Sequence, residues 1–339
     1  MLYQHVSIDS IAHVDAPVRL RSAEIVRRLR PALQRLDIPA GALLEDVAGI
    51  RERRAWVATT RVSDAATMAA EKALAASVVP FDRIGVLINT SVCRDFLEPS
   101  TASVVHAALG LAHTCQNFDV GNACLAFLTG MDIAARMIEH RDVDYALIVD
   151  GEVSNEITDR TIERLNAPDT TADQFRAEFA SLTLGSGAAA MVLGHSSLLP
   201  AGHRFRGGVS LAATSFSHLC RGTMDRMVTD SGALLDEGLK LAGETYQIAG
   251  ATLGWAATEP DEFAIHQVSK VHTDALIRQL GIDPAKVLAL YPDHGNLGPA
   301  AIPSVLSKLD GMGRLRPRQR VALMGIGSGL NCSMAEIVW

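Results

Sequence analysis

The stretch NFDVGNACLAFLTGMDIAARMIE, residues 117–139, predicts a strand, a tight turn and a buried helix in succession. Residues 118–120 are typical of a strand end, Gly121 and Asn122 of a turn, and the residues from Ala123 onward of a helix. The helix is apolar on nearly every side, which favours a position inside an α/β protein. A reactive group at the start of this helix therefore requires a tunnel that leads to it.

Cys124 stands at the predicted corner between strand and helix. Unpaired backbone N–H groups at a helix N-terminus stabilise a thiolate, so we expect a lowered pKa for Cys124 and assign it as the candidate nucleophile. The alternative is that Cys124 is a small buried apolar residue, which is the usual environment of a free cysteine.

The composition of the whole chain is that of an ordinary globular protein. Its 339 residues are 48% hydrophobic and 20% charged, enough for a large core and about two domains. The formal net charge of -7 argues against a nucleic-acid partner. No apolar run approaches the ~20 residues that a membrane-spanning helix needs, so any membrane contact is expected to be peripheral.

Cysteine usage and motif searches exclude several classes of protein. The 5 cysteines include no CxxC pair, and the chain starts without a basic-then-apolar signal peptide, so reduced thiols and a cytoplasmic location are expected. No GxSxG or HExxH motif occurs, and the spacing of His266 and His272 does not place them on one helical face. We therefore predict no metal and no resident cofactor.

Helix and strand patterns alternate along the chain, as in α/β proteins. Helices are expected at residues 22–36, 63–77, 99–109, about 225–253, 273–280 and 299–309. Strands are expected at 84–89, 145–149, 262–266, 287–290 and the C-terminal end, a strand and loop at 2–15, and a turn followed by a strand at 184–194. Residues 152–182 are polar and helix-forming, and we expect them to leave the core as an excursion that covers a pocket.

A Gly-Ser-Gly turn leads into an apolar strand twice, within residues 184–194 and 325–339. This faint internal repeat suggests two halves that meet near residues 195–205. We expect an N-terminal half at residues 1–198, which carries the candidate nucleophile and the excursion, and a C-terminal half at residues 199–339.

His266 in FAIHQVS and Asn296 in HGNLGPA each lie where a strand or a Gly/Pro loop meets a helix start. Sheets of α/β proteins present functional groups at such places. Taken singly, His266 is expected to be a core histidine and Asn296 a turn residue. Together with Cys124 they form a set of cysteine, histidine and asparagine.

Four charged residues are further candidates. Glu98 precedes Pro99, which fits the first position of the predicted helix, so one role for Glu98 is that of a carboxylate at a helix start. Arg51, Arg53 and Arg54 could hold a phosphorylated carrier such as coenzyme A. The alternative for this cluster is a solvated charged turn.

The stretches FDVGNACLAF, HQVS, HGNLGPAAIPSVL and GIGSGLN resemble the ketoacyl synthase III branch of the thiolase superfamily. That resemblance implies a thiolase-like five-layered αβαβα fold of two similar halves and a tight homodimer. It also implies that Cys124 becomes acylated and that His266 and Asn296 bind the thioester oxygen. The backbone N–H groups of Cys124 and Ser328 are the implied oxyanion hole.

The closer resemblance is to OleA-type enzymes of bacterial long-chain olefin biosynthesis, which join two fatty acyl-CoA molecules head to head. It rests on NTSVCRDFLEPSTASVV, NACLAFLTGMDIAARM and GIGSGLNCSMAEIVW. This resemblance implies a non-decarboxylative Claisen condensation through an acyl-cysteine, which gives a 2-alkyl-3-oxo acid after thioester hydrolysis. Downstream enzymes of olefin formation are the further partners that it implies.

Glu98 distinguishes the OleA-type resemblance from a resemblance to ordinary ketoacyl synthases III. In ordinary ketoacyl synthases III the position of Glu98 is typically occupied by an apolar residue. Condensing two plain acyl thioesters requires a base that removes a proton from the α-carbon. In the OleA-type family the equivalent glutamate reaches across the dimer interface, so the resemblance implies that role for Glu98. Burial beside two alkyl chains is expected to raise its pKa.

Some features depart from the family pattern or leave alternatives open. HQVS replaces the HQAN of many ketoacyl synthases III, and His294 leaves open a Cys-His-His arrangement, although the HGN context favours Asn296. Cys332 follows the GSG turn and is expected in the core. A malonyl-dependent 3-oxoacyl-ACP synthase III, an acyl-CoA thioesterase and a noncatalytic partner subunit are the alternative functions.

Overall fold

The computed structural model describes residues 1–39, 43–223, 226–255 and 259–339. Within these ranges a 9-stranded mixed sheet has the strand order β11-β12-β13-β8-β1-β7-β6-β4-β5. Its strands are β1 Val6–Asp15, β4 Ile84–Asn89, β5 Gln116–Asp119, β6 Tyr145–Glu152, β7 Gly187–His195, β8 His203–Ala212, β11 Glu262–Ile265, β12 Arg320–Gly327 and β13 Asn331–Val338. Two small two-stranded sheets add β2 Val18–Arg21 with β3 Glu52–Ala55 and β9 Cys220–Gly222 with β10 Met227–Thr229.

The helices cover the sheet on both sides and also fill the space between its two ends. They are α1 Ser22–Arg28, α2 Arg30–Arg35, α3 Val62–Ala75, α4 Thr101–Leu109, α5 Ala126–Glu139, α6 Asn155–Asn166, α7 Ala172–Glu178, α8 Ser231–Leu253, α9 Lys270–Leu280, α10 Tyr291–His294 and α11 Ala301–Gly311. None of the helices within the described ranges is long and apolar enough to cross a membrane.

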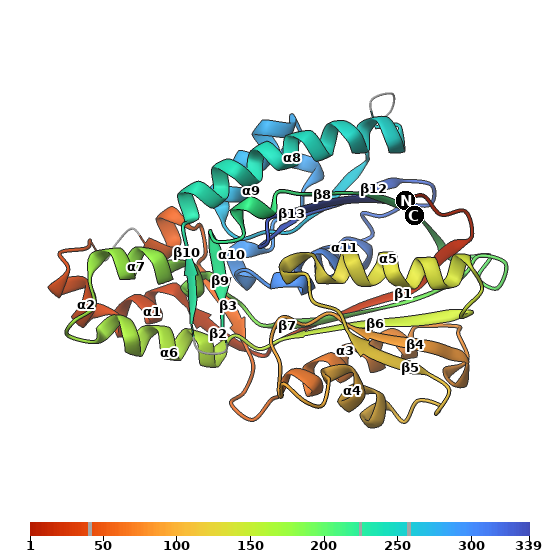
Figure 1. Ribbon diagram of the computed structural model, residues 1–339, viewed down its shortest axis with the longest axis horizontal. Coiled ribbons are helices and arrows are strands. Elements are labelled where there is room, and N and C mark those ends of the chain that lie inside the picture. The colour runs from red at the N-terminus through yellow and green to blue at the C-terminus, as the bar shows by residue number, and fades with distance from the viewer. Residues whose placement is uncertain (40–42, 224–225, 256–258) are drawn as a thin grey trace.

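The two ends of the sheet form two layers with α5 and α11 between them (Figure 1). Helices α3 and α4 cover the outer face of one layer, and α8 and α9 cover that of the other. The layers join where β1 pairs with β8 at Ser7 and Ile8. The five-layered αβαβα arrangement expected for this chain is therefore present.

Four strands of each layer have the same order and directions, which explains the faint repeat in the sequence, and β5 is an additional edge strand of one layer. β7 lies between β1 and β6 and is antiparallel to both, just as β13 lies between β8 and β12. Each of these two central strands follows one of the GSG turns. The expected boundary at residues 198 and 199 falls in the connection between β7 and β8, and the division into halves stays a prediction.

Burial explains why these segments form strands and helices. β6 and β7 are buried along their whole length because helices cover both faces of their layer, which suits their runs of Ala, Val, Leu and Ile. The central helix α5 is buried through residues such as Phe127, Leu128 and Met131, which belong to the largest core cluster. Packing against both layers thus fixes the helix that begins next to Cys124.

Some predicted elements differ from the structure. The helix predicted at residues 22–36 is divided at Leu29 into α1 and α2, because Pro31 lacks an N–H and its ring opposes the preceding turn. The strand predicted at residues 287–290 is reduced to an isolated bridge at Val287.

The long helix predicted from residue 225 begins later, at Ser231. The Asp230 side chain accepts a hydrogen bond from Ala233 N at 3.0 Å, which caps the first turn of α8. Residue 225 itself lies outside the described residues. The hairpin of β9 and β10 occupies part of the preceding chain.

Helices α1, α2, α6 and α7 form a separate group at one end of the layers, which we call the end lobe (Figure 1). Its own buried cluster includes Ile25, Leu29, Leu33, Ile162, Leu165, Phe175 and Leu182. The predicted excursion at residues 152–182 supplies α6 and α7. That it covers a pocket stays a prediction, although Glu156, Ile157 and Ala180 line the pocket described below.

Candidate active site

A pocket of about 930 Å³ lies at the N-terminal ends of the two central helices. Its wall includes Cys124 and Ala126 at the start of α5, and Asn296, Leu297 and Gly298 just before α11. Short helical turns precede both helices and contact each other. A pocket therefore reaches Cys124, and a tunnel to it stays a prediction.

A strained corner holds Cys124 at this pocket. Ala123, the preceding residue, has a φ of 46°, in the left-handed region that a non-glycine residue rarely adopts. The corner packs directly on β12, because a Cβ added at Gly325 would lie 2.6 Å from Leu125 Cδ2. The glycine of β12 thus allows the strand to support the turn that carries the cysteine.

Burial, together with the nearby Cys220 and Glu152, raises the pKa of Cys124 to about 12. The lowered pKa expected from the sequence is wrong, because the loss of hydration outweighs the effect of backbone N–H groups at the helix start. Cys124 is therefore a thiol at rest. Its proton must leave as the sulfur attacks a substrate.

His266 and Asn296 contact each other at the same pocket. His266 Nε2 lies 3.2 Å from Asn296 Oδ1, and this oxygen also accepts a hydrogen bond from Gly298 N at 2.9 Å. Since the amide oxygen is occupied, Asn296 Nδ2 is the donor left for a ligand. Burial lowers the pKa of His266 to about 4, so its imidazole is neutral at pH 7.

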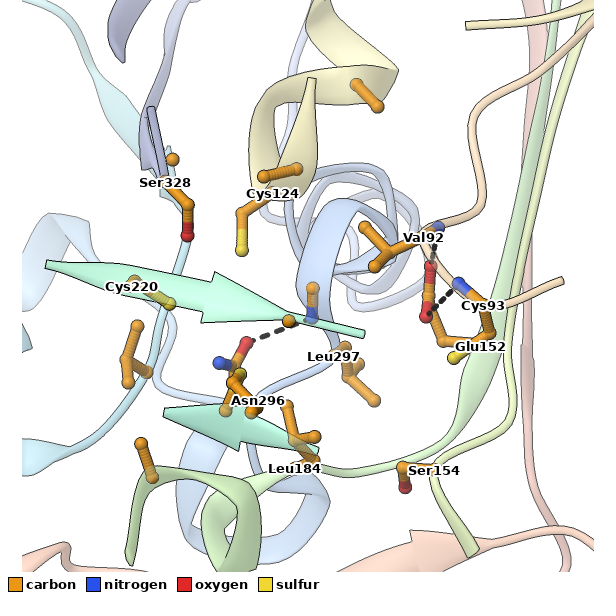
Figure 2. A pocket seen from close by; sticks show the side chains of 18 of the residues that line it. Val92, Cys93, Cys124, Glu152, Ser154, Leu184, Cys220, Asn296, Leu297 and Ser328 are labelled. Carbon is orange, nitrogen blue, oxygen red and sulfur yellow. Dashed lines mark hydrogen bonds between the residues drawn. The ribbon is translucent and has the colours of Figure 1, made fainter. Parts of the chain in front are cut away.

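Figure 2 shows Cys124, Ser328, Cys220 and Asn296 around one space. Ser328 belongs to the GSG turn between β12 and β13, and the structure places it at the pocket with Cys124, His266 and Asn296. Cys220 of β9 was not among the predicted site residues. Side chains from distant parts of the sequence therefore converge on one site.

The predicted carrier-binding arginines do not line this pocket. Arg53 is only 1% exposed, and its Nη2 donates a hydrogen bond to Ser22 Oγ at 3.0 Å inside the protein. A guanidinium with so little exposure cannot meet a phosphate that arrives from solvent, so the assignment of Arg53 is wrong. Arg51 forms a surface ion pair with Asp293 at 2.7 Å, and Arg54 is also absent from the lining.

The arginines that do line the pocket are Arg61, Arg94 and Arg226. Arg94 lies 3.7 Å from an oxygen of Asp119, and Arg226 Nε donates to Glu178 at 2.6 Å. The predicted arginines at positions 51, 53 and 54 are close together in the sequence. The residues that reach the pocket are scattered along the chain.

The structure also disfavours the alternative Cys-His-His arrangement that would include His294. His294 Nε2 lies 3.2 Å from Asp15 Oδ1, and the side chain does not line the pocket. Asn296 occupies the wall instead, as the HGN context indicated. Cys332 is 0% exposed in the core, which confirms the expectation for that residue.

Glu98 lies outside the pocket of its own chain. It belongs to residues 90–100 between β4 and α4, which we call the Glu98 loop. Residues 90–97 of this loop line the pocket, whereas Glu98 is exposed and does not. Three apolar side chains of the loop are also exposed: Val92 is 52%, Phe96 47% and Leu97 84% accessible.

The alternative role of Glu98 as a helix-start carboxylate is wrong. Helix α4 begins at Thr101, two residues after Pro99. Asp119 at the end of β5 accepts hydrogen bonds from Thr101 N at 3.0 Å and Ala102 N at 2.8 Å. A carboxylate from another strand therefore satisfies the first N–H groups of this helix.

Carboxylates also fix the Glu98 loop to the rest of the chain. Glu152 accepts hydrogen bonds from Val92 N at 2.6 Å and Cys93 N at 3.4 Å (Figure 2). Asp95 of the loop accepts hydrogen bonds at 2.7 and 3.1 Å from the first two N–H groups of α3. The loop is thus held from two sides, and its exposed apolar tip projects from a fixed base.

Glu152 is a candidate functional residue that the sequence analysis missed. It ends the buried strand β6, is 5% exposed and lines the pocket. Burial raises its pKa to about 7, although the N–H groups of Val92 and Cys93 oppose that shift. A carboxyl group at the C-terminal end of a buried parallel strand was the available signal.

A thiolase-like fold with a cysteine, a histidine and an asparagine around one pocket points to the 3-oxoacyl-ACP synthase III class of transferases. Residues 118–205 match the family model described as 3-Oxoacyl-[acyl-carrier-protein (ACP)] synthase III, and residues 251–339 match the model of its C-terminal part. Both models cover segments that carry pocket residues.

Individual relatives specify the family further. The chain is 56% identical to an acyl-CoA:acyl-CoA alkyltransferase of Xanthomonas campestris pv. campestris and 36% identical to an enzyme of the same name from Shewanella oneidensis, with 100% of each chain covered. The crystal structure of cerulenin-bound OleA from Xanthomonas campestris matches with a TM-score of 0.97 at 56% identity, over 100% of this chain and 98% of that one. The chain therefore belongs to the OleA family of transferases, and its thiolase-like fold is confirmed.

Proposed function

We propose that this enzyme joins two long-chain fatty acyl-CoA molecules in a non-decarboxylative Claisen condensation. The observation that carries the proposal is the meeting of Cys124, His266 and Asn296 in one pocket, while Glu98 projects from an exposed apolar loop. The names of the relatives support it. So does a crystal structure of the Xanthomonas enzyme with bound lauric acid and lauroyl-CoA.

The first step transfers an acyl group to Cys124. The sulfur attacks the thioester carbon, and the backbone N–H groups of Cys124 and Ser328 bind the oxyanion. The bond to the CoA sulfur breaks, and the proton of the Cys124 thiol ends on the released CoA. The exchange of one thioester for another is balanced without an added cofactor or metal.

The second step forms the carbon–carbon bond. A second acyl-CoA places its carbonyl oxygen at His266 and Asn296, whose N–H groups stabilise the enolate while Glu98 removes the α-proton. The α-carbon attacks the acyl group on Cys124, the cysteine sulfur leaves, and the proton held by Glu98 restores the thiol. Hydrolysis of the remaining thioester releases CoA and a 2-alkyl-3-oxo acid.

Glu98 performs this step in the pocket of a second subunit under our proposal. It is exposed in its own chain, and the apolar side chains of Val92, Phe96 and Leu97 around it are those expected at an interface. Variants of the Xanthomonas enzyme with known structures alter a glutamate, a cysteine and a histidine. These three positions have the same spacing in that chain as Glu98, Cys124 and His266 here.

The first test uses one saturated acyl-CoA and no malonyl donor. Myristoyl-CoA alone should yield a 3-oxo acid that decarboxylates to a symmetrical ketone, detected by mass spectrometry. A malonyl-dependent synthase would form product only after malonyl-CoA or malonyl carrier protein is added. A thioesterase would release myristic acid without any condensed product.

The second test locates Glu98. A heterodimer of one Cys124→Ala chain and one Glu98→Ala chain contains one site with both defects and one site with neither if Glu98 crosses the interface. Both parent homodimers should be inactive in condensation, whereas the heterodimer, purified through two different tags, should recover about half of the wild-type activity. Heterodimer activity no higher than that of the parents contradicts the cross-subunit role.

The remaining expectations are part of the same proposal. The enzyme acts as a homodimer in the cytoplasm without a resident cofactor or metal. Its 2-alkyl-3-oxo acid is the substrate of downstream enzymes that form long-chain olefins or ketones. The excursion at residues 152–182, which belongs to the N-terminal half, covers the pocket.

A further inference from the structure

We propose that Gly238 sets the length of the alkyl chain that one arm of the pocket accepts. The inference rests on the proposed function, because it assumes that the pocket holds fatty acyl groups. We call this region the α8 arm. It is formed by Leu234, Leu235, Gly238 and Leu239 of α8, Leu276 of α9 and Ile326 of β12.

The α8 residues of the arm form one stripe of the helix. Leu234, Leu235, Gly238 and Leu239 follow the i, i+1, i+4, i+5 spacing of a single helical face. The three leucines are only partly buried although they are apolar, because their side chains border the open pocket. Gly238 interrupts this leucine stripe at the pocket wall.

Neither backbone conformation nor crowding requires glycine at position 238. The residue lies inside the regular helix α8, and a Cβ added there would be 3.7 and 3.8 Å from two carbon atoms of Ile326, which is ordinary contact. Gly130 of α5 differs, since its added Cβ would lie 2.8 Å from Thr90 Cγ2. Packing therefore accounts for Gly130 but not for Gly238.

Glycine inside a helix lowers stability relative to alanine. At Gly238 neither backbone geometry nor packing compensates for this loss of stability. What the glycine provides is open space along the wall of an apolar arm. A flexible saturated chain is the ligand that fits such a space, because it forms no hydrogen bonds and gains free energy from each buried methylene.

The α8 arm is connected to the reacting groups through Ile326. This residue contacts the position of Gly238 and stands between Gly325 and Gly327 in β12. Ile326 and His266 line the same pocket, and the backbone of Ile326 forms a hydrogen bond with the His266 side chain. An alkyl chain that starts at the thioester near His266 can therefore run past Ile326 along α8.

The test compares decanoyl-CoA with myristoyl-CoA in Gly238→Leu and Gly238→Ala proteins. Each buried methylene contributes about fourfold to affinity, so the loss of room for two methylenes should change the myristoyl-to-decanoyl ratio about 15-fold. Gly238→Leu should show at least that change in favour of decanoyl-CoA. Gly238→Ala should show a smaller change in the same direction.

Gly243 provides a matched control on the same helix. It lies outside the pocket lining, and an added Cβ would be 3.6 Å from Gln279 Nε2. Alanine at either position should raise Tm by about 2 °C, since both substitutions remove a helical glycine. The same substitutions at Gly243 should leave the chain-length ratio as in the wild type.

Two measurements identify which chain the arm holds. The first is acylation of Cys124 by each acyl-CoA, followed by intact mass, and the second is the amount of condensed product. A shifted acylation ratio places the cysteine-bound chain in the α8 arm, and a ratio shifted only in the product places the second chain there. Both results support the proposal.

The proposal is overturned if folded Gly238→Leu and Gly238→Ala proteins keep the wild-type ratio in both measurements. Calorimetric titration of both acyl-CoAs into the same variants, made in a Cys124→Ala background, measures the preference without any reaction. A wild-type enzyme that binds acyl-CoA but forms no condensed product contradicts the proposed function instead. The two failures are thereby distinguished.

Discussion

Glu152 and Glu98 stand at the two sides of one loop, and their surroundings are opposite. Glu152 is 5% exposed at the end of a buried strand, and its carboxylate accepts hydrogen bonds from two backbone N–H groups of the loop. Glu98 is exposed beside apolar side chains and outside the pocket of its own chain. The Glu152 carboxylate therefore binds groups of its own subunit, whereas the Glu98 carboxylate is accessible to another molecule.

This difference suggests separate functions for the two carboxylates, one in positioning the Glu98 loop and one in chemistry. A carboxylate that anchors backbone N–H groups holds the loop in one conformation, which limits the positions that the loop tip can take. A carboxylate that acts as a base needs an open lone pair and access to the α-proton. We therefore expect Glu98 substitutions to affect chemistry and Glu152 substitutions to affect the position of the loop.

The largest expected effect belongs to Glu98→Gln. Loss of a general base lowers the rate by about 10²–10⁴-fold, so ketone formation from myristoyl-CoA should fall by that factor. Acylation of Cys124, followed by intact mass, should stay at the wild-type level because it needs no carbanion. Loss of acylation in this variant would assign Glu98 to the nucleophile or to the fold.

The next effect is on stability and compares the wild type with Glu152→Gln. The pKa of Glu152 is raised to about 7 from 4.5, so the folded state binds the proton more tightly than the unfolded state. The contribution of this group to stability is therefore complete below pH 4.5 and is lost as the pH rises through 7. Between pH 4.5 and pH 7 the unfolding free energy of the wild type should therefore fall by up to about 3 kcal/mol relative to that of Glu152→Gln.

Denaturant titrations of both proteins at several pH values measure this difference directly. Burial and the neighbouring Glu152 both raise the pKa of Asp150, so the difference between the two proteins reports this pair of carboxyl groups and not residue 152 alone. A constant difference in unfolding free energy from pH 4.5 to pH 7 would mean that Glu152 is ionised throughout. The hydrogen bonds from Val92 N and Cys93 N would then be made to an ionised Glu152 at every pH in this range.

The same Glu152→Gln variant should show a moderate loss of condensation. A glutamine amide can accept from one loop N–H but presents a donor to the other, which removes about one charge-assisted hydrogen bond and lowers the rate about tenfold. Steady-state assays with myristoyl-CoA measure it. A loss as large as that of Glu98→Gln would instead make Glu152 the base.

The smallest expected effect is that of Asp95→Ala. This substitution removes the hydrogen bonds to the first two N–H groups of α3, which should cost about 1 kcal/mol in unfolding free energy. Condensation should fall less than about threefold, because Glu152 still anchors the loop near Val92. An effect equal to that of Glu152→Gln would mean that the loop responds to any lost anchor.

Much of the fold could be predicted because strands such as β4 and β6 are continuous apolar runs between helical patterns. Cys124, His266 and Asn296 could be found because each is adjacent to a turn or a strand end with a characteristic sequence. Glu152 could not, since a carboxylate after an apolar strand is common and its burial depends on the Glu98 loop packing over it.

Other predictions failed because they depended on contacts between distant residues. The start of α4 is set by Asp119 from a neighbouring strand, which a local reading of Glu98 and Pro99 does not include. The pKa of Cys124 depends on desolvation by the whole pocket, and this outweighs the local helix terminus. Arg53 is charged in the sequence yet buried in the structure.

The outward position of Glu98 has a consequence for the kinetics of the enzyme. If each pocket borrows its base from another copy, activity per chain depends on the total concentration of the protein. A dissociated chain still carries Cys124 and can accept one acyl group. It then stays acylated, because it lacks the base that the condensation step requires. A dilution series, assayed for both acyl-cysteine and ketone, should show the ketone signal falling while the acyl-cysteine persists.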